Sequence, residues 1–398
     1  LHDRAWPALP LLACYVLVSV VGALILPRIF EGMPVNLLIE RHGMDHAPVP
    51  LTFTLANAVQ AVNLCVHAVV LLFLLQASAR ADWRPARLMW AIALGVALMF
   101  GIGLYERLAP LLEWPSSVKF WMNNPGYVQY HTANIAGFLR IAAPMSEASY
   151  ASTFLAAALA GLLAVMAFGP RRTTMRWGAM SLGALVVVVV LVNTLGTTGW
   201  VAAAISCGAI ALWLGISAIR TPSPISRSLR TRTLVVLGAM SLVVLAFGWA
   251  WKASPAAPQV NKVVDTLLLK KLEGGSAKIR NRSNDHALQI VKDTRGLGVG
   301  LGSNRASSFF ASLVSNTGVP GALLFITMLV TLLWRYARAR LSAAQRFAAV
   351  SLATATLAMG LAIPDLNLPV YWIFIFLAFL FCPPVPRRSA ETAARAHA

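Results

Sequence analysis

The sequence predicts an all-α membrane protein that crosses the bilayer many times. Of its 398 residues, 58% are hydrophobic and only 12% are charged, and the mean hydropathy is +0.70. A soluble domain carries about a quarter charged residues, so roughly half of the usual charge is missing. A helix spans a bilayer with roughly 18 or more apolar residues, and about ten runs approach that length. We therefore expect a single integral membrane domain over residues 1–398.

The expected spans follow one another along the chain, and most connections between them are short. They cover residues 8–28, 51–76, 88–105, 151–169, 177–195, 199–219, 233–251, 308–334, 347–363 and 369–383, with ends defined to within several residues. Longer connections occur at 29–50, 106–150 and 252–307, and none has the size of a soluble catalytic domain. Any functional site should therefore be formed by these loops where they lie on the spans.

Arginines in the short connections predict the orientation. With a cytoplasmic N-terminus, the inside segments are residues 1–7, 77–87, 170–176, 220–232, 335–346 and 384–398. They are rich in arginine and contain only Asp3, Asp82 and Glu391 as acidic residues. Basic residues favour the cytoplasmic side, so both termini are expected inside and the three long loops outside. The net charge of +19 then reflects topology, and nucleic acid is not an expected partner.

The residues that usually bind metals show no ligand pattern. Cys14, Cys65, Cys207 and Cys382 lie in or beside expected spans and form no CxxC pair, so neither a disulfide nor a zinc site is indicated. The stretch HGMDH at 42–46 has no further ligand-type neighbours, and a solvated loop explains it better than a metal centre. We expect no metal and no other cofactor.

The second long loop, 106–150, ends in an apolar stretch that contains one arginine. IAGFLRIAAPM carries Arg140, and a helix start follows at Ser146, with Glu147 in its first turn. Ser146 can cap this helix, and an acid there suits the helix dipole. A cation inside an apolar segment at the membrane face is costly unless it meets an anion or water. Arg140 is therefore a predicted site residue.

The third long loop, 252–307, is the most polar part of the chain and places cations on both sides of a helix. ALQIVKD has apolar residues at 287, 288, 290 and 291, which predicts an amphipathic helix on the membrane surface. The surrounding cations are Lys278, Arg280, Arg282, Lys292, Arg295 and Arg305. Because arginine suits bidentate phosphate contacts, we expect them to converge on an anion. A solvated basic loop is the alternative.

Four glycines alternate with other residues in GLGVGLGS, residues 296–303. A dinucleotide fingerprint needs the spacing GxGxxG between a strand and a helix, and the spacing here is GxGxGxG, so we exclude a nucleotide. Small residues also permit close helix packing in lipid, and this alternative stays open for GVPG at 318–321. For the glycine run we favour a re-entrant turn whose backbone N–H groups approach a bound anion together with Arg305.

These motifs together resemble the superfamily of O-antigen ligases and polysaccharide polymerases. Its members have a many-spanning, GT-C-like helical bundle with a large periplasmic loop late in the chain. That loop typically carries an arginine, an amphipathic helix, a glycine turn and a helix ending in G..G. Arg280 or Arg282, ALQIVKD, GLGVGLGS and NTGVPG match this order. Arg140 matches an arginine in the family's earlier loop, and the similarity covers roughly residues 130–325.

The resemblance implies a metal-independent glycosyltransferase in the bacterial inner membrane, with its active site facing the periplasm. The donor would be an oligosaccharide on undecaprenyl diphosphate. The acceptor would be another glycan in a polymerase, or lipid A-core in a ligase. Other polysaccharide-assembly proteins and the lipid bilayer would be further partners. Arg140 with Arg280 or Arg282 would bind the diphosphate, and we add Arg295 and Arg305 from their proximity to the glycine turn.

One position departs from the family pattern. Ligases of the family carry a histidine at the start of the helix after the glycine turn, and Ser307 stands there in this sequence. Serine is a poor general base near neutral pH, so another group must activate the acceptor hydroxyl, or none does. Glu147 and His286 are the first alternatives, followed by Asp285 and His131. The missing histidine favours a polymerase over a ligase.

Two other functions remain open. A transporter of lipid-linked oligosaccharide is the main alternative, but the sequence has no convincing internal repeat and its cations lie in loops on one face. A structural or assembly protein would not need arginines beside apolar helices. A last polar turn, between the final two spans, carries Asp365 and Asn367. These residues either contact sugar or form an ordinary turn.

Overall fold

The computed structural model describes residues 7–36, 48–80, 82–115, 134–135, 138–168, 174–220, 238, 241 and 275–384. This part of the chain is mostly helical, and 6 of its helices are long and apolar enough to cross a membrane. They are Ala8–Ile29, Leu55–Ser78, Pro85–Leu108, Ala148–Phe168, Thr197–Ile216 and Phe309–Ala337. The prediction of a polytopic all-α membrane protein is confirmed at this level.

Helices occupy every expected span that lies within the described residues. They are α2 (Ala8–Ile29), α3 (Leu55–Ser78), α4 (Pro85–Leu108), α6 (Ala148–Phe168), α7 (Thr174–Asn193), α8 (Thr197–Arg220), α13 (Phe309–Ala337), α14 (Ala343–Ala362) and α15 (Pro369–Leu380). The amphipathic helix predicted around ALQIVKD is α12 (Gly275–Asp293). The expected span at 233–251 lies outside the described residues, apart from positions 238 and 241.

Two short antiparallel hairpins lie in the loops. β1 (Pro34–Val35) pairs with β2 (Val49–Pro50) between α2 and α3. β3 (Asn134–Ile135) pairs with β4 (Phe138–Leu139) immediately before Arg140. Beside the first hairpin, Gly32 N donates to Leu51 O at 2.9 Å, which joins the segment after α2 to the segment before α3.

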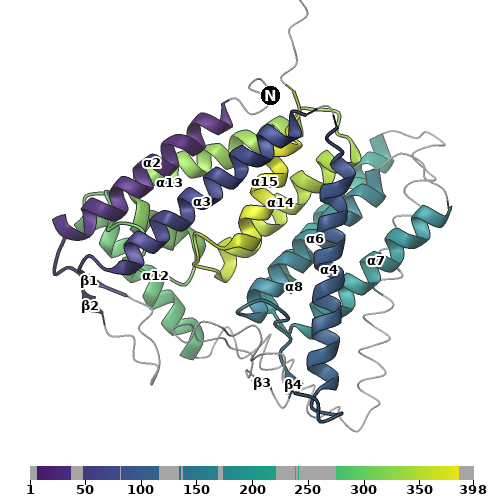
Figure 1. Ribbon diagram of the computed structural model, residues 1–398, viewed down its shortest axis with the longest axis horizontal. Helices are drawn as coiled ribbons and strands as arrows, with labels where there is room; N and C mark the ends of the chain where they lie inside the picture. The colour runs from purple at the N-terminus through teal and green to yellow at the C-terminus, as the bar shows by residue number, and fades with distance from the viewer. Residues whose placement is uncertain are drawn as a thin grey trace, which may run out of the picture.

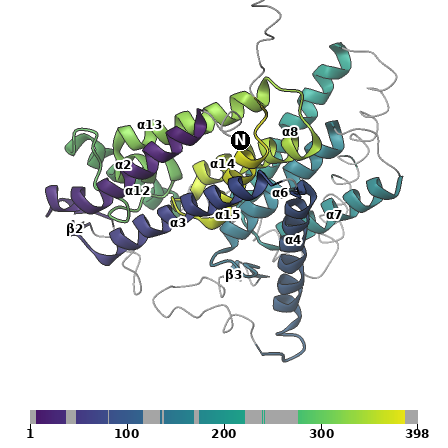
Figure 2. The same ribbon diagram turned by 45° about the horizontal axis from the view of Figure 1, so that its top comes forward.

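The helices form two groups that meet at α14 and α15. In one group α13 packs along α2, and α2 packs along α3 (Figure 1). In the other group α6 packs against α7 and α8, and most extensively against α14. α4 stands at the edge of the second group in two views, with few contacts to other elements (Figures 1 and 2). α12 lies against α13 and reaches β1.

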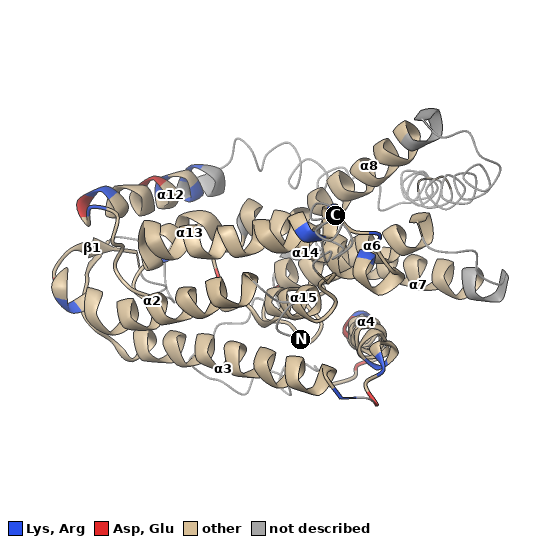
Figure 3. Ribbon diagram, turned by 90° about the horizontal axis from the view of Figure 1, so that it is seen from above, with Lys and Arg blue, Asp and Glu red and all other residues tan. Residues whose placement is uncertain are grey.

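Charged side chains gather on α12 and near helix ends. α12 carries lysines, arginines and aspartates along its length, whereas the middle parts of α2, α3 and α13 carry none (Figure 3). A charge inside the hydrocarbon core of a bilayer is costly. This distribution is therefore the one expected of long helices inside a membrane with α12 at the surface.

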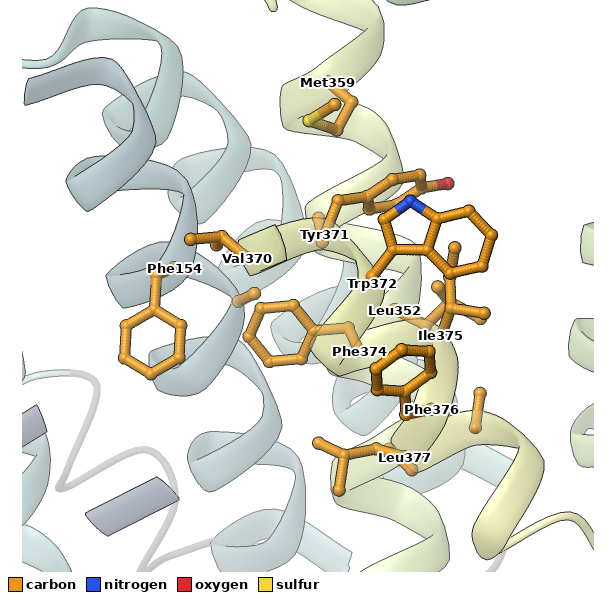
Figure 4. Close-up of a cluster of buried hydrophobic side chains, with 14 of the residues drawn as sticks. Phe154, Leu352, Met359, Val370, Tyr371, Trp372, Phe374, Ile375, Phe376 and Leu377 are labelled. Atoms are coloured by element: carbon orange, nitrogen blue, oxygen red, sulfur yellow. The ribbon is translucent and has the colours of Figure 1, made fainter. Parts of the chain in front are cut away.

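α15 is apolar on all sides and fills the space between the two groups. Tyr371, Trp372, Phe374 and Ile375 have 0% exposed surface, and Phe374 lies next to Phe154 of α6, with 5.8 Å between the ring centroids (Figure 4). A helix that is hydrophobic around its whole circumference is typically buried. Trp372 Nε1 also donates to the backbone oxygen of residue 366 at 3.2 Å, so this core holds the turn that carries Asp365.

Small residues bring α6 and α14 close together. α6 is rich in alanine and almost entirely buried. A Cβ atom at Gly161 would lie only 3.0 Å from the backbone oxygen of Phe347. Ser351 Oγ donates across the same contact to Ala157 O at 2.9 Å. Close helix approach in membranes relies on such residues. Glu147 directly precedes α6 in the chain.

Candidate functional site

The glycine run packs against three helices. Gly296, Gly298, Gly300 and Gly302 all have positive φ angles, of 85°, 74°, 91° and 80°. A Cβ atom at Gly298 would lie 2.7 Å from the backbone nitrogen of Gly318, where α13 is kinked. Cβ atoms at the next two glycines would lie 2.7 Å from a backbone oxygen of α2 and 2.8 Å from one of α3. Only glycine fits these approaches.

The backbone of the glycine run binds other parts of the protein. Val299 N donates to Ser315 O and Gly300 N donates to Asn316 O, both at 2.9 Å. Gly298 N donates to Thr294 Oγ1 at 3.0 Å. These N–H groups have intramolecular partners, so the prediction that they bind an anion is wrong. The packing alternative, which the sequence left open only for GVPG, extends to the glycine run.

Asparagines satisfy the buried polar groups around this turn. Asn57 of α3 donates through Nδ2 to Leu301 O at 2.7 Å and to Ser303 Oγ at 2.8 Å. Asn304 N donates to Asn316 Oδ1 at 3.1 Å, and Asn316 Nδ2 returns a bond to Asn304 O at 2.7 Å. Irregular backbone at membrane depth requires such internal partners. The turn is therefore a rigid support for the residues that follow it.

α12 presents one face to α13, and Arg280 lies on that face. Asn284 and Ala287 follow Arg280 by four and seven residues, so all three share one side of the helix. Ala287 has 0% exposed surface. Asn284 Oδ1 accepts the backbone N–H groups of Ser307 and Ser308 at 2.9 and 3.1 Å, at the start of α13. The first half of α12 is thus fixed to the N-terminus of α13.

Arg305 lies at the same junction. Its backbone N–H donates to Asn36 O at 2.7 Å, and its backbone oxygen accepts from Ser283 Oγ at 3.2 Å. The loop after β1, the start of α12 and the approach to α13 therefore meet at Arg305.

Arg140 directly follows β4 in the chain and is partly buried. Its Nε atom is buried and has no hydrogen-bond partner among the described residues. Burial lowers the pKa of the Arg140 guanidinium, Glu147 opposes this effect, and Arg280 lowers the pKa further. Arg140 and Arg280 are therefore close enough to repel each other, although 139 residues separate them in the chain.

Asp365 extends this group. Burial raises the pKa of its carboxyl, the N–H of Asn367 and the charge of Arg305 oppose this, and Glu147 raises the pKa further. Asn367 N donates to Asp365 Oδ1 at 3.0 Å. Asn367 in turn donates through Nδ2 to the Gln60 backbone oxygen at 2.9 Å, and its own Oδ1 is buried without a partner in the described structure.

These charge interactions link five side chains from four separate parts of the chain. The charge of Arg140 interacts with those of Arg280 and Glu147. The carboxyl of Asp365 interacts with Glu147 and Arg305. We call Arg140, Glu147, Arg280, Arg305 and Asp365 the charge cluster. Three arginines against two carboxylates leave the cluster with a net positive charge even when both acids are ionised. A group of side chains with a net positive charge attracts anions.

Other predicted site residues lie elsewhere. Arg282 is exposed, and two residues along α12 turn it by about 200° from Arg280. Arg295 is exposed beyond the far end of α12, about 22 Å from Arg280 at 1.5 Å per residue. His286 Nε2 donates to Pro34 O at 3.2 Å and so faces β1. Asp285 is exposed.

Two further predictions end differently. His131 lies outside the described residues. Ser308, next to the position where the family carries histidine, is the N-cap of α13, and its side chain accepts from Ala311 N at 3.4 Å. Asp365 joins the cluster although the sequence placed it only in a polar turn. Its one sequence signal was an acid between two apolar spans on the same predicted face as Arg140.

The comparisons with known proteins add no relative: no family model matches the chain, and no curated protein matches its sequence.

Proposed function

We propose that this protein is a glycosyltransferase of the O-antigen ligase and polysaccharide polymerase kind, acting on a donor linked to undecaprenyl diphosphate. The observation that carries the proposal is that Arg140, whose buried Nε has no hydrogen-bond partner among the described residues, lies within reach of the charge of Arg280 on the face of α12 that packs on α13. Two partly buried cations repel each other and are stabilised together when an anion binds both. A diphosphate offers adjacent charged groups with oxygens for bidentate contacts.

The cluster arginines would stabilise the leaving group. When the sugar is transferred, the bond between its anomeric carbon and the diphosphate oxygen breaks, and the bonding electrons leave with the lipid diphosphate. Negative charge therefore grows on the leaving oxygen in the transition state. Fixed cations in a partly dry site stabilise that charge more than they stabilise the ground state. Arg305, whose charge acts on Asp365, would supply a third cation.

Asp365 is our choice for the group that activates the acceptor. As the acceptor hydroxyl forms its new bond to the anomeric carbon, it must lose a proton, and the Asp365 carboxylate can accept it. A carboxyl whose pKa is raised by burial is a better base near neutral pH than an ordinary one. Glu147 already accepts from Ser149 Oγ at 2.9 Å, and His286 faces β1, so both are weaker alternatives.

The proposal places the cluster on the periplasmic side of the inner membrane. It includes about ten spans, both termini in the cytoplasm and residues 252–307 in a large periplasmic loop, because arginine dominates the opposite connections. Ser307 in place of the ligase histidine favours a polymerase, whose acceptor is another lipid-linked repeat unit. A ligase acting on lipid A-core is the second form of the proposal.

A reconstituted assay tests the proposal. The purified protein is placed in nanodiscs with a lipid-diphosphate-linked repeat unit, and glycan length and undecaprenyl diphosphate release are followed. We expect growing chains and lipid diphosphate from the wild type, and neither from Arg280→Ala. Arg282→Ala is the matched control and should retain activity. Release that depends on added lipid A-core would indicate a ligase. Lipid crossing the bilayer with no glycosyl transfer would replace the proposal with a transporter.

A further inference from the structure

A buried carboxylate on α4 lies outside the charge cluster. The buried residues of α4 are Ile92, Met99, Gly103 and Glu106, which form one stripe along a helix whose other residues are exposed or half-buried. Glu106 has only 8% of its surface exposed. An acid buried among apolar neighbours is costly unless it accepts hydrogen bonds. We therefore expect hydrogen-bond donors beside the Glu106 carboxylate.

The partner is the backbone that follows Arg140. Glu106 Oε2 accepts the N–H of Ala143 at 3.4 Å, and the N–H of Ala142 also donates to the carboxylate. Both alanines have 0% exposed surface. Ala143 has a φ of 51°, in the left-handed region that is unfavourable for a residue with a side chain. The carboxylate therefore stabilises a strained backbone within three residues of Arg140.

α4 touches the same segment one turn earlier. A Cβ atom at Gly103 would lie 2.9 Å from Ile141 Cγ2, so α4 and the Arg140 segment are in close contact there. Ile141 N also donates to Asn193 O at 3.3 Å, at the end of α7. Glu106 and Asn193 thus both hold the segment that immediately follows Arg140.

We propose that Glu106 is a positioning residue that holds Arg140 turned into the charge cluster. The inference rests on the proposed function for its catalytic meaning, and the described contacts through which Glu106 would act on Arg140 are those with the backbone of Ala142 and Ala143. Without the carboxylate, two buried N–H groups lose their acceptor and the left-handed turn at Ala143 relaxes. Arg140 then moves relative to Arg280. A displacement of about 1 Å at a reacting group can cost about 100-fold in rate.

Three variants of the full chain test this role. Glu106→Leu keeps the size and removes both acceptors, whereas Glu106→Gln keeps one acceptor oxygen. Glu113→Leu is the matched control, because Glu113 is exposed five residues after the end of α4. We expect kcat/KM for the lipid-linked donor to fall about 100-fold in the leucine variant and less in the glutamine variant. The control should match the wild type.

A double variant separates positioning from general support of the fold. If Glu106 acts through Arg140, then Glu106→Leu should lower activity little further in an Arg140→Ala background. A full 100-fold loss in that background would overturn the proposal, because Glu106 would then act independently of Arg140.

A chemical readout keeps the test independent of enzymatic activity. Phenylglyoxal modifies accessible arginines, and peptide mass spectrometry reports the extent at each one. Arg140 should react faster in Glu106→Leu than in the wild type, with Arg282 unchanged as the internal reference. Equal Arg140 reactivity in both proteins would reject the positioning role. Faster labelling in a protein that transfers no glycan would support the positioning role and reject the proposed function alone.

Discussion

Replacing Arg140 with alanine should remove most of the activity and leave the fold intact. A hydrogen bond to a charged group contributes about 1.5–3 kcal/mol, and an arginine can make two such bonds to a phosphate. The transition state then loses about 3–6 kcal/mol, which corresponds to about 10² to 10⁴-fold in kcat/KM. This loss arises only from the contacts between Arg140 and the bound diphosphate.

The same substitution should change the free energy of unfolding little. The Arg140 Nε atom has no hydrogen-bond partner in the described structure, and Arg280 disfavours the Arg140 charge. Alanine removes that repulsion along with the attraction to Glu147. We therefore expect a change of less than about 1 kcal/mol, unlike the larger losses typical of a buried residue with satisfied bonds.

The assay measures both properties on the same preparation. Donor turnover in nanodiscs gives kcat/KM, and thermal unfolding in detergent gives the melting temperature. Arg282→Ala is the control, since it removes an exposed arginine two residues from Arg280 on α12. Equal activity losses in the two variants would contradict the reasoning. So would a clear fall in melting temperature for Arg140→Ala, because the activity loss would then follow from unfolding.

Two further predictions concern the acid of the cluster and the glycine turn. Asp365→Asn keeps the oxygen that accepts from Asn367 and should lower kcat about 10² to 10⁴-fold by removing the base. Because burial raises the pKa of Asp365, its contribution to stability is present at low pH and is lost as the pH rises through that pKa. At neutral pH the asparagine variant should therefore melt no lower than the wild type, and a lower melting temperature would contradict this. Gly298→Ala should lower the free energy of unfolding by about 1–3 kcal/mol or more. The φ of Gly298 is 74°, and a Cβ atom there would lie 2.7 Å from Gly318 N. Gly101→Ala in α4, which meets nothing within 4 Å, should not destabilise the protein, and equal melting temperatures of the two glycine variants would refute the packing argument.

The membrane helices could be predicted because they depend on local properties. A long apolar run defines a span without reference to any other part of the chain. The described helices α2, α3, α6 and α13 therefore begin and end near their expected positions. The amphipathic helix around ALQIVKD was predicted for the same reason, although α12 starts well before it, at Gly275.

The role of the glycine run could not be predicted from its spacing. Alternating glycines suit both an anion-binding turn and close backbone packing. The choice depends on which segments lie beside the glycines. These segments are α2 and α3, which are distant in the sequence, and the kink at Gly318 in α13. The structure places backbone atoms there, and the N–H groups of Val299 and Gly300 donate to α13.

Some members of the charge cluster could be predicted from the sequence, and others could not. Arg140 and Glu147 stood out because each is a charge beside an apolar run. Arg280 could not be separated from Arg282 until Ala287 and Asn284 showed which face of α12 packs on α13. Asp365 was undervalued because its neighbours Arg305 and Glu147 lie 60 and 218 residues away along the chain.

The most direct measurement is the affinity of the protein in nanodiscs for undecaprenyl diphosphate and for undecaprenyl monophosphate. Wild type should prefer the diphosphate by about 10 to 100-fold, the worth of one further charge-assisted contact. Arg140→Ala and Arg280→Ala should each abolish that preference, while Arg282→Ala keeps it. If the wild type binds both lipids equally, or if the Arg140 and Arg280 variants keep the preference, the cluster is not a diphosphate site and the account is wrong.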